Sequence, residues 1–133
     1  MPTQEEIHSR VERLAERKGK YTKEAYFFIF EALSYTVKKL ELSGKQRHVT
    51  GQQLLEGVSE FGMDQFGPMT KNVFEHWGVT KTRDFGEIVF HLVDEGLMGK
   101  TEEDSIEDFS DVYDFDTEFD WHKGIGRNFR GDP

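Results

Sequence analysis

Three ionisable side chains stand at helical spacing in the second half of the chain. Glu87, His91 and Asp94 lie at offsets of four and seven positions, so a helix would place them on one face. Carboxylates and an imidazole on one face can bind a divalent metal. A solvent-facing Glu–His pair has the same spacing, and no second histidine lies at a helical offset to complete a site. Both interpretations stay open, and we assign no metal and no cofactor.

The sequence lacks the motifs of the common enzyme classes. Asp84-Phe85-Gly86 spells the metal-binding tripeptide of protein kinases, but a kinase also needs a glycine-rich loop, a strand lysine and a catalytic loop. The chain has no Gly-x-Ser-x-Gly elbow, no phosphate-binding loop and no cysteine. We therefore predict no catalytic residue, and a binding protein is favoured over a small metal-dependent enzyme.

The negative charge of the chain is concentrated in one short stretch. The net charge is −9, yet residues 1–100 carry 14 Lys and Arg against 15 Asp and Glu, whereas residues 101–120 carry ten acids and no base. The stretch lacks the Asp-x-Asp-x-Asp-Gly pattern of a calcium loop. Aromatic and acidic residues alternate in it, which predicts an extended segment with one aromatic face and one carboxylate face. The aromatic positions are Phe109, Tyr113, Phe115, Phe119 and Trp121.

This acidic, aromatic-backed segment suggests two interpretations. It is either an edge strand with a solvated acidic face, or a surface for a basic protein partner. A partner would be steered by the charge and anchored by aromatic side chains. Self-association is also possible, through the aromatic helix predicted at residues 22–40. The predicted partner-binding residues are Phe90, Asp114, Asp116, Phe119 and Trp121.

Nucleic-acid binding is the alternative function. Affinity for phosphates needs clustered Lys and Arg. The acidic stretch at residues 101–120 would instead repel a nucleic-acid duplex. A limited basic group lies elsewhere, at Lys38, Lys39, Lys45, Arg47 and His48. If the protein is a nucleic-acid-associated regulator, we expect this group to make the contact.

Sequence patterns predict that most of the chain is helical. The capping boxes Thr3-x-x-Glu6 and Thr50-x-x-Gln53 begin two helices. Further helices are expected at residues 22–40, after Gly67-Pro68 and in residues 82–94. The last of these has a continuous apolar stripe, and Gly96 fits a left-handed position after its end. The stripe consists of Phe85, Ile88, Val89 and Leu92.

These elements define the predicted fold class. We expect a mainly helical α+β protein, a compact bundle of about five helices that ends in a small β-hairpin and resembles a winged-helix domain. Residues 1–120 are predicted to form one globular domain and residues 121–133 a disordered tail. No run approaches the ~18 apolar residues of a membrane span, and residues 1–10 have no signal-peptide core. A cytoplasmic location is the default expectation.

Several longer phrases stand together in a fixed order. They are YTKEAYFFIFEAL, RHVTGQQLLEG, DQFGPMTKNVFEHWGV, TRDFGEIVFHLVDEGLMGK and DSIEDFSDVYDF. In that order the chain resembles an uncharacterised family of small prokaryotic proteins, a domain of unknown function, over residues 21–115. The resemblance implies no activity, cofactor or catalytic residue, so it bears on the fold alone. Members of the family that it resembles typically have a basic pair near the position of Tyr21, where this chain has Lys20.

Overall fold

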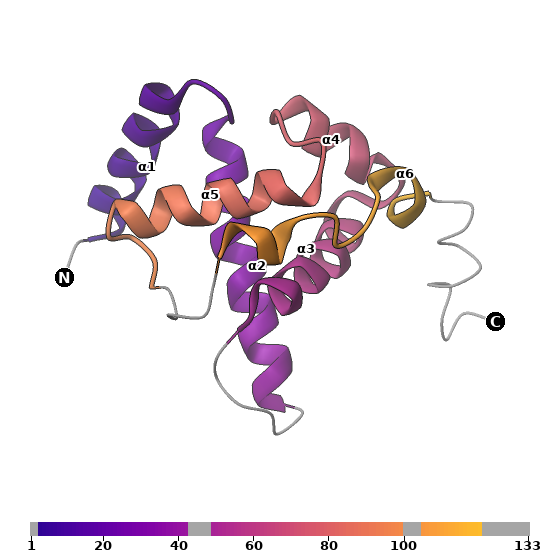
Figure 1. The fold of residues 1–133 in the computed structure, drawn as a ribbon. Coiled ribbons are helices and arrows are strands. Elements are labelled where there is room, and N and C mark those ends of the chain that lie inside the picture. The colour runs from indigo at the N-terminus through magenta and orange to yellow at the C-terminus, as the bar shows by residue number, and fades with distance from the viewer. Residues whose placement is uncertain (1–2, 43–48, 100–104, 121–133) are drawn as a thin grey trace.

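The computed structural model describes residues 3–42, 49–99 and 105–120, and most of them are helical (Figure 1). The α-helices are α1 (Gln4–Lys18), α2 (Lys23–Leu42), α3 (Gly51–Phe66), α4 (Thr70–His76), α5 (Thr82–Asp94) and α6 (Phe115–Glu118). Two 3₁₀ turns accompany them, η1 (Gly67–Met69) and η2 (Ile106–Phe109). The helices predicted before residue 95 are therefore all present.

Both predicted capping boxes form. The hydroxyl of Thr3 accepts from the backbone N–H of Glu6 at 3.1 Å, and the Glu6 carboxylate accepts from the N–H of Thr3 at 3.1 Å. Thr50 and Gln53 make the same reciprocal pair at the start of α3. Each box satisfies two backbone N–H groups that the first helical turn leaves without acceptors.

Helix α2 is the element against which the others pack, because it contacts α1, α3 and α5. Its buried residues are Ala25, Tyr26, Phe28, Ile29, Ala32 and Thr36. The ring of Phe28 lies 5.3 Å from the ring centroids of both Phe74 and Trp77. This aromatic group joins α2 to the α4 corner within one hydrophobic cluster.

Helix α5 crosses the front of the bundle (Figure 1). Its predicted apolar stripe is confirmed, since Phe85, Ile88 and Leu92 are fully buried and Val89 nearly so. Gly96 follows the end of the helix with φ +75°, the left-handed conformation expected there.

The predicted β-hairpin and the winged-helix-like arrangement are wrong. The described part of residues 105–120 contains no strand; it forms η2 and α6. Phe115 and Phe119 stand four apart, so one helical turn places both on the same side. The same two positions satisfy an odd-position alternation, which explains the error. Asp114 caps the turn, because its carboxylate accepts from the N–H of Thr117 at 3.1 Å.

Residues 105–120 form what we call the acidic strap, which packs along α5 and α3 (Figure 1). The ring of Phe109 enters a notch between two helices where Gly51 and Gly86 carry no side chain. A Cβ on Gly86 would lie 2.6 Å from the Cβ of Phe109, and a Cβ on Gly51 would lie 2.9 Å from its ring. The strap can therefore approach this closely only because both positions are glycine.

Candidate functional site

A partly buried polar junction links the α1–α2 corner to α5. The hydroxyl oxygen of Tyr21 lies 2.6 Å from Oδ1 of Asp84 and 2.8 Å from Oε1 of Glu87. The ammonium of Lys20 donates to the same Glu87 oxygen at 3.0 Å. A phenol has one proton to donate, so Tyr21 donates to one carboxylate at a time, and Lys20 supplies a second donor. We call Lys20, Tyr21, Asp84 and Glu87 the polar junction.

The carboxylate of Asp84 is buried and accepts several hydrogen bonds from the protein. Its side chain is 4% exposed. Its Oδ2 accepts from the backbone N–H and the hydroxyl of Thr80 at 2.9 and 3.3 Å, and from the N–H of Lys81 at 3.3 Å. Charge-assisted bonds to backbone N–H groups at a helix start stabilise a carboxylate. Asp84 thus connects the start of α5 to Tyr21 at this corner.

The pKa values of the junction suit a structural role. Burial opposes the ionisation of Glu87, but the hydrogen bonds from Lys20 and Tyr21 outweigh it and lower the pKa of this carboxyl. Burial and the two carboxylates raise the pKa of Tyr21 far above its ordinary value. Tyr21 therefore stays protonated and acts as a donor, not as a base.

The metal candidates Glu87, His91 and Asp94 are not brought together as one ligand set. Glu87 belongs to the polar junction, while Nδ1 of His91 lies 2.9 Å from the hydroxyl of Tyr26. Burial and the nearby charge of Lys18 lower the pKa of His91, and burial raises the pKa of Tyr26 to about 12. Across the residues that the structure describes, no group of three or more His, Asp or Glu side chains could hold a metal ion.

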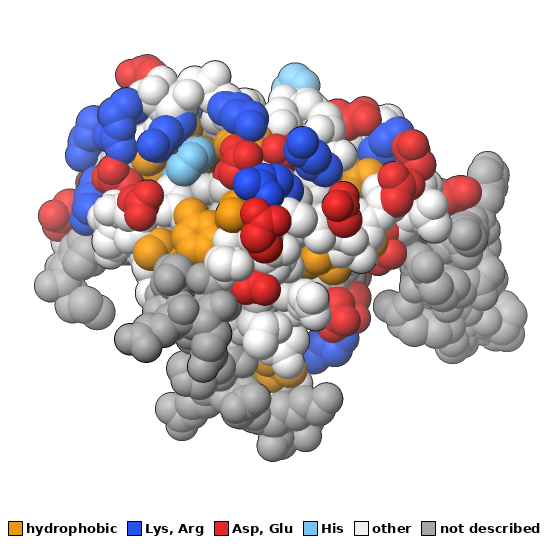
Figure 2. Space-filling model, viewed as in Figure 1, with side chains coloured by type: hydrophobic (Ala, Val, Ile, Leu, Met, Phe, Trp, Pro, Cys, Tyr) orange, Lys and Arg blue, Asp and Glu red, His pale blue; other side chains and the backbone are white. Residues whose placement is uncertain are grey.

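The acidic strap turns its aromatic rings inward and most of its carboxylates outward. Phe109, Phe115 and Phe119 are 2%, 4% and 6% exposed. The outward carboxylates are Glu107, Asp111, Asp114, Asp116 and Asp120, all exposed. Figure 2 shows acidic side chains gathered around α6, whereas Lys and Arg gather over α1. The predicted division into an aromatic side and a carboxylate side is therefore present, on helical turns instead of a strand.

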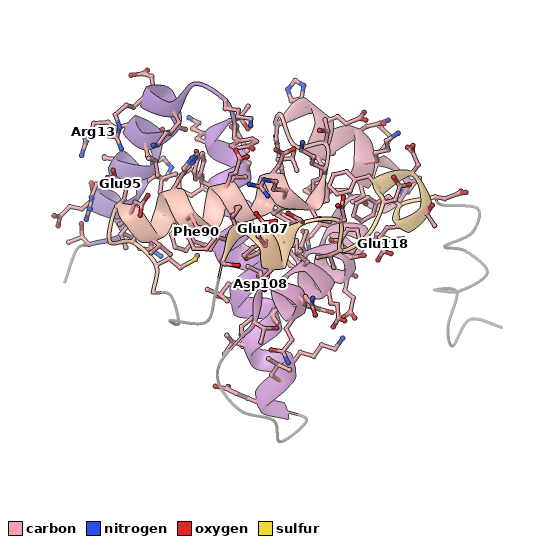
Figure 3. The ribbon with its side chains drawn as sticks, viewed as in Figure 1. Arg13, Phe90, Glu95, Glu107, Asp108 and Glu118 are labelled. Atoms are coloured by element: carbon pink, nitrogen blue, oxygen red, sulfur yellow. The ribbon has the colours of Figure 1, made fainter. Side chains whose placement is uncertain are left out.

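The predicted partner-binding residues have different surroundings. Phe90 is half-buried and its ring meets that of Phe109 edge to face at 6.2 Å; Figure 3 shows it above η2. Phe119 packs against Phe74 and Phe115 in the core, so we do not propose it as an anchor. Asp114 and Asp116 are exposed. Trp121 lies outside the described residues.

Side-chain contacts with three helices, α3, α4 and α5, hold the strap in place. The hydroxyl of Thr82 donates to the carbonyl oxygen of Phe109 at 2.6 Å and accepts from the N–H of Val112 at 3.2 Å. Tyr113 donates to the carbonyl oxygen of Leu55 at 2.7 Å. The remaining pairs are Arg83 with Glu107 and Ser110, Ser59 with Glu118, and Lys71 with Asp116.

Sequence reasoning missed most of these contacts. Thr82 lies 27 residues from the carbonyl oxygen that it contacts, and Tyr21 lies 63 residues from the carboxylate that it contacts. The two glycines of the notch carry no local signal of the ring between them. One available signal was Asp114 three residues before Thr117, a spacing typical of a capped helical turn.

The nucleic-acid candidates Lys45, Arg47 and His48 lie outside the described residues. None of the described helices is both long and apolar enough to cross a membrane. Comparison with family models, with curated proteins and with solved structures found no match. The family resemblance thus stays a prediction, and the site must be interpreted from its own chemistry.

Proposed function

We propose that the protein is an interaction module that presents the acidic strap to a basic protein partner. The observation that carries this proposal is the division of the strap: three rings are inserted in the core, and five carboxylates face solvent. The rings hold the strap in one conformation. Because the strap is already ordered, it loses less conformational entropy when a partner binds its carboxylates.

The surroundings of the strap favour a cationic partner. Glu107 and Asp116 form ion pairs with Arg83 and Lys71, respectively. Both pairs are largely exposed, and such pairs are easily exchanged for others. Exposed carboxylates speed the encounter with a partner of opposite sign and make that encounter sensitive to salt.

Affinity capture with matched variants tests the proposal. One variant neutralises the strap with Asp111→Asn, Asp116→Asn and Asp120→Asn. The control carries the same change in net charge on exposed positions of α1 and α5, with Glu5→Gln, Glu16→Gln and Asp94→Asn. Tagged wild type, strap variant and control are each incubated with lysate, with and without nuclease, and bound proteins are identified by mass spectrometry.

We expect a basic protein that binds the wild type and the control, survives nuclease, and is lost from the strap variant and at high salt. The purified partner should then bind the wild type directly. If all three baits capture the same proteins, or if capture depends on nucleic acid, the strap is not the binding surface.

A further inference from the structure

Met69 is the exposed methionine of the α3–α4 corner. It is the last residue of η1 and is 52% exposed. The other two methionines that the structure describes, Met63 and Met98, are half-buried and pack against the hydrophobic cluster. A methionine is oxidised more readily when a reagent in solution can reach its sulfur. Met69 is therefore the most accessible of the three to a dissolved oxidant.

An amide donor lies beside the sulfur of Met69. Nδ2 of Asn72 is 4.0 Å from Sδ of Met69, and both residues are exposed. The Asn72 amide has two N–H donors, whereas a thioether sulfur is only a weak acceptor. An oxygen atom added to Sδ on the side of Asn72 would be a stronger acceptor within reach of that amide. This arrangement would stabilise the oxidised side chain in addition to its contact with water.

We propose that Met69 is a site of reversible oxidation, at which a hydroperoxide converts the thioether to a sulfoxide that accepts a hydrogen bond from Asn72. The sulfur lone pair attacks the terminal oxygen of the hydroperoxide, so that an S–O bond forms as the O–O bond breaks. The proton on the transferred oxygen passes to the departing oxygen, which leaves as an alcohol, or as water when the oxidant is hydrogen peroxide. The sulfur loses two electrons and the peroxide gains them, so no other reactant is needed.

The surroundings of Met69 allow this change without unfolding. Oxidation of a buried methionine places a polar group among apolar side chains and disrupts their packing. At Met69 the new oxygen meets water and the Asn72 amide instead. Helix α4, which begins at the next residue, inserts Phe74 into the core and pairs Lys71 with the acidic strap. Both contacts stay in place, so oxidation changes the polarity of this corner and not the fold.

A time course of oxidation tests the site. Full-length protein is treated with hydrogen peroxide, and the sulfoxide at each methionine is measured by peptide mass spectrometry. We expect Met69 to be oxidised severalfold faster than Met63 and Met98, because those two are half-buried. Met69→Leu should remove the fast step and leave the two slower rates unchanged. Equal rates at the three methionines would overturn the assignment.

Protein oxidised only at Met69, taken early in the time course, tests the role of Asn72. The side-chain amide protons of Asn72 should shift downfield in the NMR spectrum on oxidation, and those of Gln53 at the start of α3 should not. The difference in urea midpoint between the wild type and Asn72→Ala should increase on oxidation, because only the wild type supplies the donor. An unmoved Asn72 signal or an unchanged difference would overturn the proposed hydrogen bond.

The same oxidised protein tests whether the change is tolerated and reversible. We expect its urea midpoint to equal that of the reduced wild type, and methionine sulfoxide reductases to restore the thioether. A wild type that oxidation at Met69 destabilises, or a sulfoxide that the reductases leave in place, would refute the inference.

Discussion

The polar junction and the acidic strap both place carboxylates against α5, but they treat the charge in opposite ways. In the junction, two carboxylates share donors from Lys20, Tyr21 and Thr80, and Asp84 is buried. In the strap, five of the seven carboxylates are exposed to water. A charge whose partners are fixed and buried stabilises one conformation, whereas a charge left in solvent remains available to another molecule.

The attachment of the two regions differs as well. The junction uses backbone N–H groups of residues 80 and 81 as donors, and the adjacent corner is closed by a backbone bond from Thr22 N–H to the Trp77 carbonyl at 3.1 Å. The strap depends on ring insertion and side-chain bonds. We therefore expect the junction to respond to loss of a hydrogen bond, and the strap to respond to changes in the shape of its notch.

The largest effect should come from filling the notch. Gly86→Ala places a Cβ 2.6 Å from Phe109, so the ring must leave or the helices must separate. We expect a loss of about 3 kcal/mol in the free energy of unfolding, measured by urea denaturation. Gly99→Ala is the matched control, since a Cβ there meets nothing within 4 Å. Equal stability of the two variants would show that Phe109 is not confined by the notch.

The next effect should come from the polar junction. Asp84→Asn keeps the size of the side chain but removes its charge, so the bonds from the N–H groups of residues 80 and 81 are no longer charge-assisted. Loss of buried hydrogen bonds to a charged acceptor costs about 2 kcal/mol. Asp94→Asn makes the same change at an exposed site and should alter stability by less than about 0.5 kcal/mol. Urea denaturation compares the two, and equal losses would remove the distinction between buried and exposed carboxylates.

A smaller, pH-dependent effect should come from Glu87. Its pKa is lowered from 4.5 in the folded protein, so its ionised form contributes stability that is fully present above the unfolded pKa. That contribution is lost as the pH falls through the lower folded pKa. Glu87→Gln should therefore be less stable than wild type near neutral pH, and the difference should shrink on acidification. Urea midpoints from about pH 7 to about pH 3 measure it, and a constant difference would contradict it.

The smallest effect should come from an ion pair on the strap. Lys71→Gln removes the contacts of Lys71 with Asp116 and Glu75, whose side chains are 74% and 45% exposed. Exposed pairs contribute little, so we expect a change below about 0.5 kcal/mol in the free energy of unfolding. A loss comparable to that of Asp84→Asn would mean that charge pairing, and not ring insertion, holds the strap in place.

Local sequence rules predicted the helices well because the evidence for each is contained within it. The capping boxes at Thr3 and Thr50 and the stripe of α5 depend on spacings of three and four residues. The strap was predicted wrongly because Phe115 and Phe119 satisfy both a strand and a helical turn. The partners of Glu87 could not be predicted, since Lys20 lies 67 residues away and only the packing of the corner brings it near.

The notch also carries an evolutionary consequence. The ring at position 109 occupies the volume that side chains at positions 51 and 86 would fill, so these three positions, far apart along the chain, form one steric unit. In related chains with this fold, we expect them to covary. A side chain at 51 or 86 should accompany a smaller residue at 109, and an aromatic residue at 109 should require glycine at both.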